Sequence, residues 1–207
     1  MKILPSIACS AILLFSSANG FASAFSPTAI SDSLAPYDIT SGWDFQLTTS
    51  FRITALDYYD SGAAGGLLTN HEVALWTSGG ALLATATVPA GSSAPLIGSY
   101  RSVAIPPIIL PPGFYEVGAF VTGYSDKYVY DSTGSTLPGI FYYESHVAVG
   151  PFAFPGSQNL VSTREITANF EAVAVVPEPQ TATLLIAGLI AVCIVTSLPR
   201  GKAISAA

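Results

Sequence analysis

Hydrophobic and polar residues alternate along several short segments in the middle of the chain. In residues 42–48, Trp43, Phe45 and Leu47 share one face of an extended strand, whereas Asp44 and the other polar residues share the opposite face. A period of two is typical of a half-buried β-strand. The same alternation returns in 114–121 and 166–172. No segment of residues 25–175 keeps an apolar period of 3.6 residues over three turns, so this region is predicted to be all-β.

Turn residues divide these segments into an antiparallel arrangement. Residues 71–77 and 81–88 flank Ser78-Gly79-Gly80, small residues that tolerate positive φ and favour a hairpin. Pro111-Pro112-Gly113 precedes the strand that begins at Phe114. Residues 51–58 change phase between Ala55 and Leu56, as a β-bulge would cause. Short strands separated by Gly, Pro and Ser loops predict an antiparallel β-sandwich, and among sandwiches we favour a jelly roll.

The N-terminus has the pattern of a secretion signal. Lys2 supplies a positive charge, residues 3–15 form an apolar core, and Ala22-Ser23-Ala24 gives a small-x-small cleavage pattern. Residues 1–24 are therefore predicted to be a signal peptide that signal peptidase removes, with Phe25 as the first mature residue. The alternative is a buried N-terminal strand or helix.

The C-terminus has the pattern of a membrane span. Residues 181–198 form an uncharged, mostly apolar run, long enough to cross a bilayer as a helix of about 18–20 residues. Arg200 and Lys202 follow in the basic end 199–207, and the positive-inside rule places them in the cytoplasm. Before the span, Pro177, Glu178 and Pro179 form a stiff stalk over 176–180, because proline fixes φ and cannot extend a helix or central strand.

This C-terminal order of stalk, span and basic residues resembles the PEP-CTERM sorting signal of Gram-negative bacteria. The resemblance covers 176–207, and Pro177, Glu178, Pro179 and the apolar stretch 184–189 match it. An interrupted basic cluster, with Pro199 and Gly201 beside Arg200 and Lys202, departs from the pattern. The resemblance implies cleavage by an exosortase-like enzyme, after transient anchoring in the inner membrane, and then release or attachment to the cell envelope. A plain single-span anchor is the alternative.

A second resemblance concerns the ectodomain, residues 25–175. The stretch 71–84, HEVALWTSGGALLA, is similar to a hairpin of a jelly-roll domain found in bacterial surface proteins, and Leu110-Pro111-Pro112-Gly113 is similar to the turn that follows in such domains. The resemblance implies a fold and brings no activity with it.

Charge and cysteine content exclude several classes. Residues 25–176 contain twelve carboxylates and only Arg52, Arg101, Lys127 and Arg164 as basic residues, a net charge of −8, so nucleic acid is not an expected partner. Cys9 lies in the signal peptide and Cys193 in the span, which leaves the ectodomain without a disulfide, a thiolate nucleophile or a cysteine-bound metal.

Candidate chemistry in the ectodomain is sparse. His71 and His146 lack metal-ligand spacing and would form a site only if the fold joined them. The acidic residues of 57–62 and the pair Asp126 and Asp131 fit a calcium loop, but turn chemistry is favoured over calcium. Nine tyrosines could stack on sugars, although strands favour tyrosine without any ligand. They are Tyr58, Tyr59, Tyr100, Tyr115, Tyr124, Tyr128, Tyr130, Tyr142 and Tyr143, and the stretches 124–130 and 142–143 look loop-like.

These observations predict a non-catalytic exported protein of the cell surface or of an exopolysaccharide matrix, with no metal or other cofactor. A carbohydrate-binding module or adhesin, with or without calcium, is the main alternative. A glycan-active enzyme is a further one, and it would need two carboxylates facing each other across a cleft.

Overall fold

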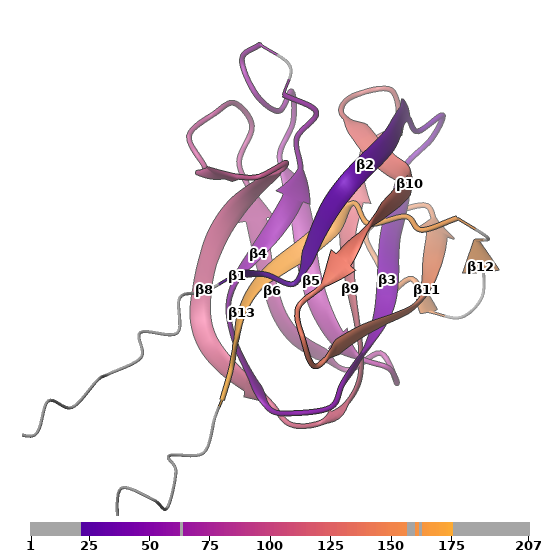
Figure 1. The fold of residues 1–207 in the computed structure, drawn as a ribbon. Coiled ribbons are helices and arrows are strands. Elements are labelled where there is room, and N and C mark those ends of the chain that lie inside the picture. Colours follow the sequence, from indigo (N-terminus) through magenta and orange to yellow (C-terminus); the bar gives the residue numbers. More distant parts are fainter. Residues whose placement is uncertain (1–21, 63, 157–159, 162, 176–207) are drawn as a thin grey trace, which may run out of the picture. The chain divides into compact units, whose positions relative to one another are not determined.

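The structure is a computed structural model, and it describes residues 22–62, 64–156, 160–161 and 163–175. These residues form antiparallel β-sheets, and no helix long and apolar enough to cross a membrane occurs among them. The five-stranded sheet has the spatial order β1 (Ala22–Ser23), β13 (Ala168–Ala174), β4 (Phe51–Tyr59), β8 (Tyr100–Leu110) and β7 (Leu96–Ile97). The six-stranded sheet has the order β12 (Leu160–Val161), β11 (Ile140–Val149), β3 (Ile39–Leu47), β9 (Gly113–Val121), β5 (His71–Thr77) and β6 (Leu82–Val88). A two-stranded sheet pairs β10 (Lys127–Thr136) with β2 (Phe25–Leu34) (Figure 1).

Aromatic residues of the two large sheets meet in a shared core. Trp43 and Phe45 of β3 lie 6.0 and 4.8 Å from Phe170 of β13, measured between ring centroids. The Trp43 indole also donates a 2.8 Å hydrogen bond to the backbone carbonyl of Ala168, which satisfies its polar edge inside the core. This packing confirms the prediction of an all-β, antiparallel sandwich.

Several local predictions are confirmed. The inward face of β3 carries the fully buried Trp43, Phe45 and Leu47. The phase change in β4 corresponds to register shifts of its pairing with β8, between Ile53 and Ala55, and of β13 opposite it. The hairpin of β5 and β6 turns at Gly80, whose φ is +82°.

Two predictions of loop structure are wrong. Tyr128 and Tyr130 belong to β10, and Tyr142 and Tyr143 belong to β11, where cross-strand pairing overrides their polar neighbours. Asp57, expected beside a turn, lies inside β4, and the turn begins only at Asp60. The sequence pattern also failed to predict the long strands β2 and β8. Their hydrophobic alternation is weak, because exposed serines and prolines interrupt their apolar faces.

The two ends of β13 lie at opposite ends of the sandwich. Antiparallel pairing with β4 places Ala168 opposite Tyr58 and Ala174 opposite Phe51. At about 3.3 Å per residue these ends are about 20 Å apart. The chain therefore leaves the five-stranded sheet at the end away from the loop that follows Tyr59 (Figure 1).

Candidate functional site

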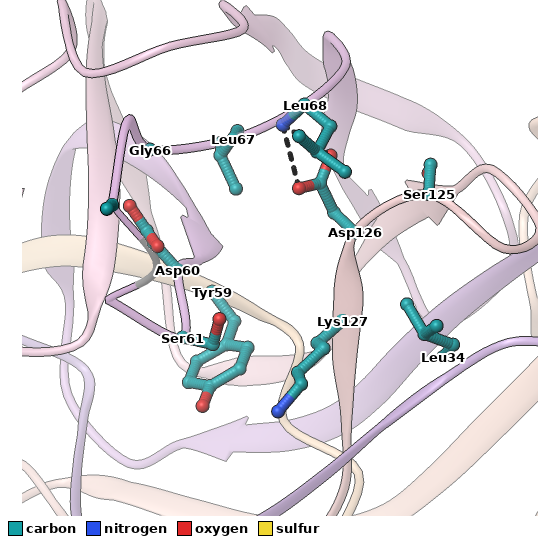
Figure 2. A pocket seen from close by; sticks show the side chains of 11 residues that line it. Leu34, Tyr59, Asp60, Ser61, Gly66, Leu67, Leu68, Ser125, Asp126 and Lys127 are labelled. Atoms are coloured by element: carbon teal, nitrogen blue, oxygen red, sulfur yellow. Dashed lines mark hydrogen bonds between the residues drawn. The ribbon is translucent and has the colours of Figure 1, made fainter.

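A pocket of about 220 Å³ lies at the end of the sandwich away from Ala174. It brings together the loop after β4 and the loop between β9 and β10, two segments that the sequence marked as acidic or rich in tyrosine. Figure 2 shows these side chains around the pocket, with Asp126 facing the backbone N–H of Leu68. The lining residues are Leu34, Tyr59, Asp60, Ser61, Ala64, Gly66, Leu67, Leu68, Ser125, Asp126 and Lys127.

The carboxylate of Asp126 is occupied by the loop that it holds. It accepts hydrogen bonds from the backbone N–H groups of Leu68 (2.8 Å) and Thr69 (2.9 Å), and its Oδ2 lies 3.0 Å from Nε2 of His71. Burial alone would raise the pKa of Asp126, but hydrogen bonds from Leu68, His71 and Thr69 outweigh burial and lower it. Asp126 is therefore a structural anion of this loop.

Asp60 is occupied in a similar way. It accepts a 2.7 Å hydrogen bond from Nε of Arg101 and a 2.8 Å hydrogen bond from the backbone N–H of Gly62. The second contact is the turn chemistry favoured for this stretch over calcium binding. Asp57 is fully buried in β4, and Asp131 accepts a hydrogen bond from the backbone of Arg164, so the predicted acidic pairs do not converge on one ion.

The fold does not join the two histidines. His71 stacks on Tyr58, with ring centroids 3.6 Å apart, and its Nδ1 lies 2.8 Å from the Phe120 carbonyl. His146 lies on β11, and strands β3 and β9 separate β11 from β5. The two histidines therefore do not form a metal site with each other.

The tyrosines do not form one exposed surface. Tyr58 and Tyr100 are buried in the core. Tyr124 is the most exposed, at 73%, and it is the one non-glycine residue with positive φ (56°) in the described part of the chain. Its N–H donates to the Ala35 carbonyl at 2.9 Å, and the next residues, Ser125 and Asp126, line the pocket. An exposed aromatic residue thus directly precedes two pocket-lining residues in the chain and has a backbone conformation that such residues rarely adopt.

A second polar cluster lies on the outward face of the six-stranded sheet, and the sequence analysis missed it. Pairing aligns Glu144 of β11, Asp44 of β3, Glu116 of β9 and Trp76 of β5 in one row. His146 projects from the same face of β11, two residues beyond Glu144. The sequence pattern assigns Asp44 to the polar face of its strand, and a polar face considered on a single strand is expected to face solvent. Only the register of four strands brings these side chains together.

The segment 150–156 covers this outward face. Phe152 and Phe154 pack on Trp76, with ring centroids 5.7 and 5.8 Å away. Pro155 lies against Gly42 and Gly118, since a Cβ on these glycines would meet its Cγ at 2.9 and 3.2 Å. Two paired glycines thus form the depression that receives the segment, and Glu116 and His146 are removed from water while Asp44 and Glu144 stay partly exposed.

Several buried polar atoms of the cluster have no hydrogen-bond partner, although the Gly156 backbone hydrogen-bonds to the Glu116 carboxyl group. Glu116 and His146 are each 1% exposed. Asp44 Oδ1, Glu116 Oε1 and both ring nitrogens of His146 have no hydrogen-bond partner among the described residues. Burial and the adjacent Asp44 carboxylate raise the pKa of Glu116 to about 8, and burial also raises the pKa of Asp44. Buried polar groups normally find partners, so this cluster is a candidate for binding something.

Some of the residues predicted for signal-peptide cleavage and C-terminal sorting lie outside the residues that the structure describes. Ala22 lies in β1, and Ala24 and Phe25 are fully buried. The backbone N–H of Phe25 donates to Asn169 Oδ1 at 3.1 Å. A cut between Ala24 and Phe25 would separate β1 from the sheet. Pro177, Glu178, Pro179, Arg200 and Lys202, together with the span 181–198, lie outside the described residues.

No protein-family model, curated protein or solved structure matches this chain.

Proposed function

We propose that this is a non-catalytic protein exported to the cell surface or to an extracellular polysaccharide matrix. The observation that carries the proposal is the direction of β13, which leaves the sandwich at Ala174, the end away from the loop pocket. A tether at this end leaves the loop end free to face the surroundings. The region without cysteines also requires no oxidative pairing outside the cell.

Processing at both ends belongs to the same proposal. Signal peptidase removes 1–24, and the span 181–198 holds the protein in the inner membrane. An exosortase-like enzyme then reads Pro177, Glu178 and Pro179. A jelly-roll winding of the sandwich is part of the proposal as well, supported by the consecutive strands β3, β4 and β5, which alternate between the two large sheets.

The sorting step is tested by Glu178→Ala in the native host. If the carboxylate between two prolines is the recognition element, the variant keeps its C-terminal helix and stays in the inner membrane, while the parent loses roughly its last thirty residues. The measurement is the intact mass of membrane-bound and released protein. Gln180→Ala is the matched control and should be processed like the parent. Equal full-length masses in parent and variant would identify a plain anchor, because acidic flanking residues contribute little to topology.

A second candidate function is carbohydrate binding at the loop pocket, with a polysaccharide of the matrix as partner. Tyr124 favours it, because this exposed aromatic residue has a strained backbone conformation and directly precedes the pocket-lining Ser125 and Asp126 in the chain. At about 220 Å³ the pocket lies below the usual range for drug-sized ligands and suits a single small ring.

A further inference from the structure

We propose that Asp44, Glu116 and His146 form a binding site for one divalent transition-metal ion of the zinc type. The three residues come from adjacent strands, β3, β9 and β11, on the outward face of the six-stranded sheet. This site is separate from the loop pocket and from the signals at the chain ends. It also adds a metal where the sequence alone predicts none.

The donor atoms already converge. One donor atom of each residue can be chosen so that all three lie within 4.8 Å of one another. Nδ1 of His146 lies 3.6 Å from Glu116 Oε1 and 3.8 Å from Asp44 Oδ1. Ligand atoms placed tetrahedrally about 2.0–2.1 Å from zinc lie about 3.4 Å from one another. The observed separations are too long for hydrogen bonds and need only small side-chain movements to surround an ion.

The same three atoms have no hydrogen-bond partner. Asp44 Oδ1, Glu116 Oε1 and His146 Nδ1 are buried without a hydrogen-bond partner. Water cannot readily replace that partner at Glu116 and His146, which are each only 1% exposed. In the described part of the chain no lysine or arginine forms an ion pair with either carboxylate. Buried acids without a cation are costly, and a divalent ion would balance two carboxylates in one step.

A carboxylate stands behind the histidine. Oε1 of Glu144 lies 3.4 Å from Nε2 of His146, the ring nitrogen other than the one near Asp44 and Glu116, without the geometry of a hydrogen bond. Metal-binding histidines usually offer their second nitrogen to such a carboxylate, which orients the ring and strengthens the ligand. The Asp44 and Glu144 side chains are 19% and 33% exposed, so an ion can enter from their side of the cluster.

The donor set selects the class of metal. Imidazole nitrogen with carboxylate oxygens suits zinc and its first-row neighbours, whereas calcium and magnesium prefer all-oxygen sites with more ligands. Three protein ligands leave a fourth position for water. All three ligands lie on strands of the sheet, so the ion would cross-link β3, β9 and β11 beneath the segment 150–156.

The test uses the full-length protein in mild detergent, stripped of metal with a chelator and titrated with Zn²⁺ by calorimetry. We expect one ion per chain and a higher melting temperature with Zn²⁺ but not with Ca²⁺. Glu116→Gln and His146→Gln should each weaken binding at least about tenfold. Glu72→Gln, an exposed carboxylate on β5 of the same sheet, is the matched control and should bind like the parent.

X-ray absorption of the zinc-loaded parent tests the site directly, so this result does not depend on whether the variants fold. A shell of nitrogen and oxygen with one imidazole supports the site. Sulfur in the shell would identify Cys9 or Cys193 as the ligand and overturn the proposal. Absence of binding by the folded parent, or unchanged affinity in both folded ligand variants, would overturn it equally.

Discussion

Asp57 is an acid placed where a charge is poorly tolerated. Its side chain is fully buried in β4, and neither carboxylate oxygen has a hydrogen-bond partner among the described residues. Burial, opposed by the Ser102 hydroxyl and reinforced by the nearby Glu171 carboxylate, raises the pKa of Asp57 to about 7. The folded protein therefore holds this proton at pH values where the unfolded chain has lost it.

The sign of the resulting pH dependence follows from linkage. With a folded pKa near 7 and an unfolded value near 3.8, the contribution of Asp57 to stability is greatest at low pH. It is lost as pH rises toward 7, by up to about 4 kcal/mol at 1.36 kcal/mol per pKa unit. Asp57→Asn should unfold at higher urea concentration than the parent at pH 8 and behave more like it at pH 4.5. Parallel pH profiles for the two proteins would show that Asp57 does not titrate this way.

At the scale of elements, the turn between β5 and β6 packs against the segment 150–156. Gly80 has a φ of +82°, and a Cβ there would meet the Phe154 ring at 2.9 Å. Gly62 has a φ of +76° in the loop after β4, and nothing lies within 4 Å of its added Cβ. The two glycines thus share a backbone conformation and differ in their surroundings.

This pair gives a matched experiment. Both Gly80→Ala and Gly62→Ala should lose about 1–2 kcal/mol of stability, because alanine is strained at positive φ. Gly80→Ala should lose more, and its segment 150–156 should become more sensitive to protease, because Phe154 must move. Chemical denaturation and limited proteolysis make the comparison. Equal losses with unchanged proteolysis would mean that Phe154 does not depend on this turn.

The same elements show how far the sequence could be interpreted. The alternation around Trp43 identified β3 and its buried face, because that pattern is local. The polar neighbour Asp44 could be assigned to a face but not to a site, since its contact with Glu116 depends on the register between β3 and β9. The covering segment 150–156 has no periodicity, and only the structure shows Phe154 and Pro155 lying on the sheet.

At the scale of the whole molecule, the loop pocket and the exit of the chain lie at opposite ends of the sandwich. If the pocket binds matrix polysaccharide, Tyr124→Ala should reduce retention of the protein on immobilised host polysaccharide several-fold, since stacking of a sugar on an aromatic ring is lost. Tyr143→Ala is the control, because Tyr143 is also exposed (64%) but contacts Phe114 on the sheet. Equal retention of the parent and both variants would exclude Tyr124 from the binding surface.

If the protein is exported as proposed, β1 can pair with its partner strand only after almost all of residues 25–175 have crossed the membrane. Ala22 and Ser23 pair with Ala172 and Glu171 of β13, the last strand. A chain that crosses the membrane from its N-terminus exposes residues 22–24 long before β13 emerges. During that interval the three small residues are unpaired and open to signal peptidase, which needs an extended, accessible substrate. The order of emergence, and not the stability of the folded sheet, then decides whether these residues are removed or become a strand.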